Sequence, residues 1–210
     1  MPESAQEYHA RIAAAADDHG RFRVGDVADW DVFPFEREGL RLKPLQPLAD
    51  SEAPRWGEGG RGCEACTQAG ERNAPEAEVW RDGHWRVTVA EPTGAPLVLI
   101  LQPLAHHDFT DLTDELAGEM GRIMVHLGAA VEALPSVARV HVSRWGDGGS
   151  HAHVFFFARP ALMPQLRGTC LALWDDFLPP VPVEVRDANA RAAFAGLVRA
   201  YGGSARGVAG

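Results

Sequence analysis

Two histidines beside a glycine-rich turn are the residues of this chain best placed to do chemistry. His151 and His153 stand two residues apart, directly after the turn at residues 146–149 and at the start of an apolar run. In a β-strand alternate side chains share one face, so the two imidazoles and Phe155 are expected side by side. A neutral imidazole can serve as a metal ligand, a general base or a nucleophile. The spacing therefore predicts a site at this turn.

A pair of cysteines supplies the second chemical signal. Cys63 and Cys66 form a Cys-x-x-Cys pair, which in a chain with three cysteines indicates a metal or redox pair rather than a disulfide framework. A structural zinc ion takes about four N or S ligands in a tetrahedron. His106, which follows an apolar run, and His151 would complete such a set.

His153 is not one of these four expected zinc ligands. Beside glycines whose amides can face a phosphate, a neutral His153 is placed to act as a nucleophile or general base. The alternative is that His153 is a hydrogen-bonded structural residue of its strand. Other candidates are interpreted as structural, either as surface or helix-face histidines or as one buried cysteine: His107, His126, His141 and Cys170.

Two helices have clear boundary signals. Ser4 and Glu7 fit a capping box for a helix over residues 8–17 that ends near Gly20. Thr113 fits an N-cap, and it precedes apolar residues at helical spacings of three and four. This second helix is expected to pack its stripe on a sheet through Leu116, Met120, Ile123, Leu127, Val131 and Leu134.

The remaining elements are short strands and late helices. Asp82-Gly83 predicts a type I′ hairpin turn between two strands. Gly202-Gly203 predicts the cap of the final helix, with a disordered tail after it. The expected strands are 78–81, 84–91, 97–101, 138–145 and 150–158, and the later helices are 166–177 and 189–201.

This order of elements predicts a mixed α+β fold in three parts. Residues 1–60 form an N-terminal helix and an extended arm, and the aromatic side chains of the arm need a partner surface to pack against. Residues 61–160 form the main domain, and residues 161–210 a C-terminal helical extension. Residues 56–62 hold four glycines and are expected to act as a hinge into the cysteine pair.

Composition excludes several classes of partner. The 210 residues carry a formal net charge of −9, which argues against binding a nucleic-acid backbone. The N-terminus has no apolar secretory core, and the longest strongly apolar run is far shorter than the roughly 20 residues that cross a bilayer. We therefore expect a cytoplasmic protein that binds neither nucleic acid nor membrane.

In the order of these motifs the chain resembles the histidine-triad superfamily. The resemblance covers about residues 61–160 and rests on the cysteine pair, a hairpin, Pro103-x-x-His106, an amphipathic helix and His151-x-His153-x-Phe155. It implies an antiparallel sheet with a packed helix, a homodimer, and a small phosphorylated or nucleotide ligand. The superfamily's middle histidine, here His153, attacks phosphorus to form a covalent nucleotidyl-histidine intermediate.

The resemblance also implies a role for the metal ligands. A zinc-bearing subset, which includes galactose-1-phosphate uridylyltransferase, binds a structural zinc through the positions that correspond to Cys63, Cys66, His106 and His151. This is the same set that zinc chemistry favours. An alternative register, with Gly149 in the first triad position, would make His151 the nucleophile but would remove one zinc ligand.

Two departures from the superfamily pattern bear on the reaction. Phe155 occupies the third triad position, where a histidine usually contacts phosphate or the leaving group, and Arg144 puts a charge in the segment before the triad. Phenylalanine can neither donate a proton nor bind an oxyanion. Substrate binding is expected from the glycine turn, nearby arginines and Phe155: Arg144, Gly148, Gly149, Ser150, Phe155 and Arg159.

The sequence thus predicts a nucleotidyl or phosphoester hydrolase, or a nucleotidyltransferase, that works through His153. The alternative from another class is a catalytically silent protein that binds a nucleotide or small ligand and has a structural zinc. In that protein Phe155 would stack on a base or ring. A third alternative is a zinc-stabilised fold without a ligand.

Overall fold

The computed structural model describes residues 2–18, 38, 53–70, 78–164 and 166–205. Within them no helix is long and apolar enough to cross a membrane. The helices are α1 (Ala5–Ala13), α2 (Glu64–Gly70), α3 (Asp114–Glu132), α4 (Cys170–Phe177) and α5 (Val183–Ala200), with 3-10 turns η2 (Glu58–Gly60) and η3 (Phe109–Asp111). The strands are β1 (Glu78–Arg81), β2 (Trp85–Val89), β3 (Val98–Pro103), β4 (Val137–Ser143), β5 (Val154–Pro160) and β6 (Ser204–Ala205).

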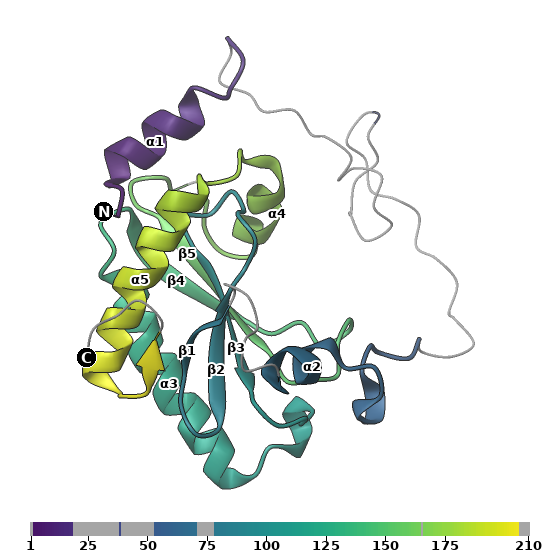
Figure 1. The fold of residues 1–210 in the computed structure, drawn as a ribbon. Helices are drawn as coiled ribbons and strands as arrows, with labels where there is room; N and C mark the ends of the chain where they lie inside the picture. Colours follow the sequence, from purple (N-terminus) through teal and green to yellow (C-terminus); the bar gives the residue numbers. More distant parts are fainter. Residues whose placement is uncertain (1, 19–37, 39–52, 71–77, 165, 206–210) are drawn as a thin grey trace.

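The strands form one antiparallel sheet in the order β4-β5-β3-β2-β1-β6. Along β3, Leu99 and Leu101 are fully buried, whereas Ile100 and Gln102 on the other face are only half-buried. This alternation gives the sheet two faces of different character. Figure 1 shows α3 and α5 together on one side of the sheet and α2 on the other.

The main core lies between the sheet and the helices α3 and α5. Ile123, Leu127 and Val131 of α3 are buried there, as the helical stripe predicts. The Thr113 side chain accepts a hydrogen bond from the Leu116 amide, which confirms the predicted N-cap. The mixed α+β class and the packed amphipathic helix are therefore confirmed.

A second apolar cluster joins α1 and α4 to the opposite face of the sheet. Tyr8 and Ile12 of α1 pack with Leu171 of α4 against Phe157 of β5. The Tyr8 hydroxyl donates to the Gly94 carbonyl oxygen at 2.5 Å. The predicted capping box of Ser4 is present, but α1 ends at Ala13, well before residue 17.

Several local expectations were wrong, for identifiable reasons. The turn before β2 is not type I′, because Gly83 has no left-handed φ; the Asp82 carboxylate instead accepts from the His84 and Trp85 amides. Cys170 is exposed, because it begins α4 on the solvent side rather than in the core.

The C-terminal elements also differ from expectation. α5 begins at Val183, immediately after the proline-rich bend, rather than near residue 189. After it, Gly202 and Gly203 take left-handed φ values as predicted, and a Cβ on Gly203 would lie 2.6 Å from the Trp80 ring. The chain then adds β6 to the sheet edge, and the last five residues, for which disorder was expected, lie outside the described residues.

The strand that carries the histidine motif begins later than expected. β5 starts at Val154, because the Ser150 amide donates to the Trp56 carbonyl and the Ala152 amide donates to the His107 carbonyl, outside the strand ladder. His151 and His153 therefore lie in the segment that leads into β5. Most of the predicted arm, residues 21–37 and 39–52, lies outside the described residues, and so do Trp30, Phe33 and Phe35.

Candidate functional site

Four side chains from three separate segments meet in a candidate metal centre. The ligand atoms of Cys63, Cys66, His106 and His151 all lie within 4.8 Å of one another. The His151 Nδ1 atom is 3.5 Å from Cys63 Sγ and 3.4 Å from Cys66 Sγ, and His106 Nδ1 is 3.4 Å from Cys66 Sγ. A tetrahedral zinc ion with ordinary bond lengths separates S and N ligands by about 3.6 Å. The donor set and spacing therefore fit zinc.

Backbone structure brings the cysteines to this point. Cys63 precedes α2, and the first turn of that helix carries Cys66 back toward it, with the Thr67 amide donating to the Cys63 carbonyl at 3.1 Å. Gly57 approaches from the other side in a left-handed conformation, with φ of 74°, and a Cβ there would lie 3.0 Å from Cys63 Cβ. Only glycine fits this approach without displacing the ligand.

The environment of His151 prepares it as a ligand. Its Nε2 atom lies 2.9 Å from the Pro103 carbonyl oxygen, which can only accept, so Nε2 carries the proton and Nδ1 faces the cysteines. Burial also lowers the pKa of His151, which keeps the imidazole neutral. Both effects suit metal binding.

The cysteine thiols need a cation to ionise in this setting. Burial, reinforced by the neighbouring Cys63 thiol, raises the pKa of Cys66 to about 11. A divalent ion would compensate the charge of two thiolates. Arg86, which is buried and donates to the Ala65 carbonyl at 2.9 Å, adds positive charge nearby.

His153 has a different hydrogen-bond partner and a different exposure. Its Nδ1 atom lies 2.8 Å from the His151 carbonyl oxygen, so in the neutral ring the proton sits on Nδ1 and the lone pair on Nε2. The ring is half-buried and lines a cavity of about 200 Å³ together with Gln102 and Gly149. The ring that keeps its lone pair on Nε2 thus lines an accessible cavity.

The glycine turn is held by the segment that precedes the metal ligands. The Trp56 amide donates to the Gly148 carbonyl at 2.8 Å, and the Trp56 carbonyl accepts from the Ser150 amide at 3.0 Å and the Ser150 hydroxyl at 3.3 Å. Residues 56–60, expected as a hinge, therefore pair with the turn through the bridge between Trp56 and Gly149. Gly149 lies against the His153 ring.

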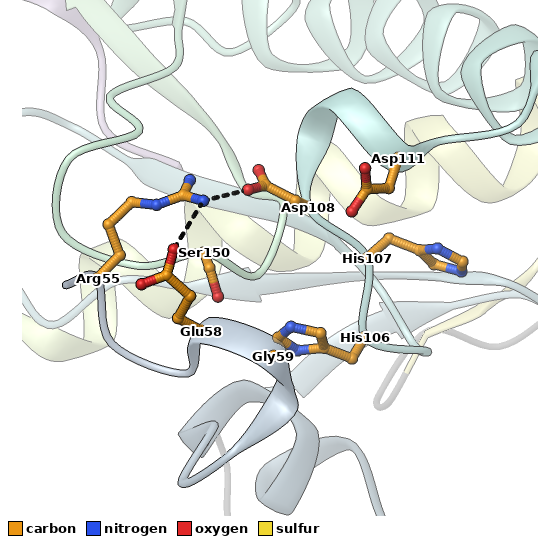
Figure 2. Close-up of a pocket in the computed structure, with 8 residues that line it drawn as sticks. All are labelled: Arg55, Glu58, Gly59, His106, His107, Asp108, Asp111 and Ser150. Atoms are coloured by element: carbon orange, nitrogen blue, oxygen red, sulfur yellow. Dashed lines mark hydrogen bonds and ion pairs between the residues drawn. The ribbon is translucent and has the colours of Figure 1, made fainter.

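Ser150 and Arg144 line cavities other than the one at His153. Ser150 lines a separate polar cavity of about 280 Å³, in which Figure 2 shows the Arg55 guanidinium paired with the carboxylates of Asp108 and Glu58. Arg144 also points toward Asp108, at 3.4 Å. Neither Ser150 nor Arg144 lines the His153 cavity.

The other two predicted binding residues are on β5. The Phe155 ring contacts the His153 ring edge to face, with centroids 5.4 Å apart. Arg159 is six residues after His153 in the chain, or roughly 20 Å away at the rise of a strand. Its guanidinium is 3.3 Å from the Pro160 carbonyl oxygen. The structure therefore places Phe155, but not Arg159, beside His153.

Sequence reasoning missed two polar residues of the site. Arg86 and Gln102 pair across β2 and β3 on the face that holds the metal centre, and Gln102 lines the His153 cavity. The sequence did carry a signal for Arg86, which alternates with the apolar residues Trp85, Val87 and Val89 of one strand. A polar side chain that a strand buries needs a polar partner, so the pattern indicates a polar site on that face of the sheet.

Comparison with solved structures defines the class of fold. A hypothetical histidine-triad nucleotide-binding protein from Sulfolobus tokodaii has a TM-score of 0.50 and 11% identity, over 67% of this chain and 97% of that one. A zinc-bound histidine-triad family protein from Mycobacterium smegmatis has a TM-score of 0.49 and 16% identity, over 65% and 94%. A uridylyltransferase mutant has a TM-score of 0.46 and 17% identity, over 69% and 50%.

The chain therefore has the histidine-triad fold, with the sheet, the helix α3 and the histidine motif in the expected order. No protein-family model and no curated protein sequence matches the chain. The likeness lies in the fold, and the chemistry has to be argued from the residues of this site.

Proposed function

We propose that this protein is a nucleotidyl or phosphoester hydrolase, or a nucleotidyltransferase, in which His153 Nε2 is the nucleophile. One observation carries the proposal: the hydrogen bond from His153 Nδ1 to the His151 carbonyl leaves the lone pair on Nε2, in a ring that lines a cavity.

The proposed reaction has two displacements at phosphorus. The Nε2 lone pair forms a bond to phosphorus while the bond to the leaving group breaks, and the leaving group departs with the bonding electrons. A water molecule or an acceptor hydroxyl then attacks phosphorus, the bond to His153 breaks, and the attacking oxygen releases its proton to solvent. Phe155 supplies no proton, so leaving groups that are stable as anions, such as a phosphate, are favoured.

Charge on the phosphoryl oxygens needs donors in the same cavity. We assign this role to the Gln102 carboxamide and to the backbone at Gly149, where no side chain obstructs close approach. The buried Arg86 contributes positive charge on the same face of the sheet. These groups take the place of the serine and arginines that the sequence suggested.

Zinc would be held by Cys63, Cys66, His106 and His151 and would have a structural role. Four protein ligands leave no open position for substrate, as in other structural sites. The ion would tie the segment before α2 to the end of β3 and to the histidine segment. Because the ligands include two free thiols, a reducing cytoplasmic setting suits this site.

The test is turnover of a nucleoside diphosphate sugar by the purified protein, because its leaving group departs as a phosphate anion. A nucleoside phosphoramidate, whose amine leaving group needs a proton, is expected to be the poorer substrate. We expect His153→Ala to abolish turnover and to retain zinc, which metal analysis measures on the same sample. Full activity in His153→Ala would contradict the proposal.

A ligand-binding protein without turnover is the second candidate. The observation in its favour is Phe155, which stands against His153 where proton transfer would need a polar group. Saturable nucleotide binding with no turnover of either substrate would favour this candidate.

We also propose a homodimer, following the resemblance to the superfamily. β4 forms one edge of the sheet, and among the described residues no strand pairs with its outer side, where Val142 is exposed. Light scattering of the purified chain tests this, and a monomer would overturn it.

A further inference from the structure

A larger cavity lies apart from the metal centre, between α4 and the strands β4 and β5. It has a volume of about 490 Å³, within the range of small-molecule sites. His141, Ser143 and Phe157 line it from the sheet, Trp145 lines it from the loop after β4, and α4 closes it with Leu171, Ala172, Leu173 and Asp176. We call it the α4 pocket.

Aromatic rings connect this pocket to His153. Phe155 contacts His153 on one side and Trp145 on the other, each with a centroid distance of 5.4 Å, so the Trp145 ring is no more than about 11 Å from His153. Phe157 continues the row, at 5.9 Å from Phe155 and 5.7 Å from Trp145. One molecule of nucleotide size spans the distance from His153 to the pocket.

The charges of the α4 pocket disfavour a phosphate. Arg144 is the one arginine or lysine among its lining residues, and its guanidinium lies against Asp108 and 4.6 Å above the Phe109 ring. The other polar groups are hydroxyls, an imidazole and the carboxyl of Asp176, whose pKa is raised by loss of solvent. Trp145, which lines the pocket, is 46% exposed, so a flat ring can stack on it.

We propose that the α4 pocket binds an uncharged planar ring carried by the molecule whose phosphorus meets His153. The link to His153 rests on the proposed function, whereas ring binding itself does not. Trp145 provides the stacking surface, buried Phe157 supports it from the sheet, and the hydroxyls and Asp176 accept hydrogen bonds from ring N–H or amino groups. The substrate class is accordingly a phosphoryl compound with an aromatic group.

Calorimetry with uncharged rings tests the site directly. Adenosine, uridine and indole are titrated into the wild-type protein and into Ala172→Phe, which fills the pocket from α4 without touching the metal centre. Val125→Phe on the exposed side of α3 is the matched control. We expect at least one ring to bind the wild type and the control equally and Ala172→Phe at least tenfold more weakly, with cyclohexanol and inorganic phosphate not competing.

A second variant guards against a folding defect in Ala172→Phe. Trp145 is half-exposed, so Trp145→Leu removes the stacking surface with little change to the core, and we expect it to weaken ring binding by at least fivefold. No ring binding to the wild type, or binding to both pocket variants as tight as to the wild type, overturns the proposal.

His153→Ala separates this inference from the proposed function. Ring binding retained in His153→Ala, in a protein that never turns over a phosphoryl substrate, leaves the pocket intact and refutes the reaction. Turnover that needs His153 but is unchanged in Ala172→Phe for aromatic substrates leaves the reaction intact and refutes the pocket.

Discussion

His153 donates its Nδ1 proton to the backbone carbonyl of His151, with the two atoms 2.8 Å apart. The residue that orients the proposed nucleophile is thus also a ligand of the candidate metal centre, so the geometry of one constrains the other. We expect the ¹⁵N spectrum of neutral His153 to show a protonated Nδ1 and an unprotonated Nε2. The opposite tautomer would remove the lone pair from the cavity and contradict the assignment.

Loss of one metal ligand should destabilise the fold. We expect Cys66→Ser to lower zinc content well below one ion per chain and to cost on the order of 4 kcal/mol in the free energy of unfolding. Cys170→Ser is the control, because Cys170 is exposed and lies outside the metal cluster. Metal analysis and urea unfolding check both variants, and equal zinc content in the two would contradict the ligand set.

The Asp108 carboxylate should act as a positioning group for the glycine turn. It pairs with Arg55, which also lies 3.5 Å from the Gly146 carbonyl oxygen, and with Arg144. We expect Asp108→Asn to reduce kcat/KM about tenfold by loosening the turn, with zinc retained. Asp187→Asn, which affects a pair with Arg186 on α5, is the control. Equal activity of the two variants would refute this role.

Asp175 should give the stability a measurable pH dependence. Burial raises its pKa above the ordinary value of 3.8, although the carboxylate accepts from the Ala95 amide at 2.5 Å. Since the folded pKa exceeds the unfolded pKa, the folded state binds more protons between them, and this contribution to the free energy of unfolding declines as pH rises through the folded pKa. Asp175→Asn should flatten the decline above pH 4 in urea unfolding. An unchanged slope would contradict it.

Residue chemistry was enough to predict the metal cluster. Zinc demands four N or S ligands, and the Cys-x-x-Cys pair with the histidines after an apolar run and after the glycine turn makes such a set, so Cys63, Cys66, His106 and His151 could be named from their types and order. The same holds for α3, because its stripe and its cap are both local signals.

The remainder of the site depends on contacts that no local pattern encodes. Arg55 meets Asp108 across 53 positions, and Trp56 meets the glycine turn across more than 90. Ser150 and Arg159 were named because they stand near the motif in sequence. The Ser150 hydroxyl instead donates to the Trp56 carbonyl, and Arg159 lies roughly 20 Å along β5 from His153, beside the Pro160 carbonyl. Valines at the start of α5 have low helix propensity, so tertiary packing of Ala188 and Phe194 sets that helix.

The most direct test of the account is to trap the intermediate. Wild-type protein is mixed with a nucleoside diphosphate sugar, quenched within a single turnover, and examined by intact mass and peptide mapping. We predict one nucleotidyl adduct on His153, absent from His153→Ala with zinc still bound. An adduct on His151, or turnover with no adduct and no dependence on His153, would contradict the account.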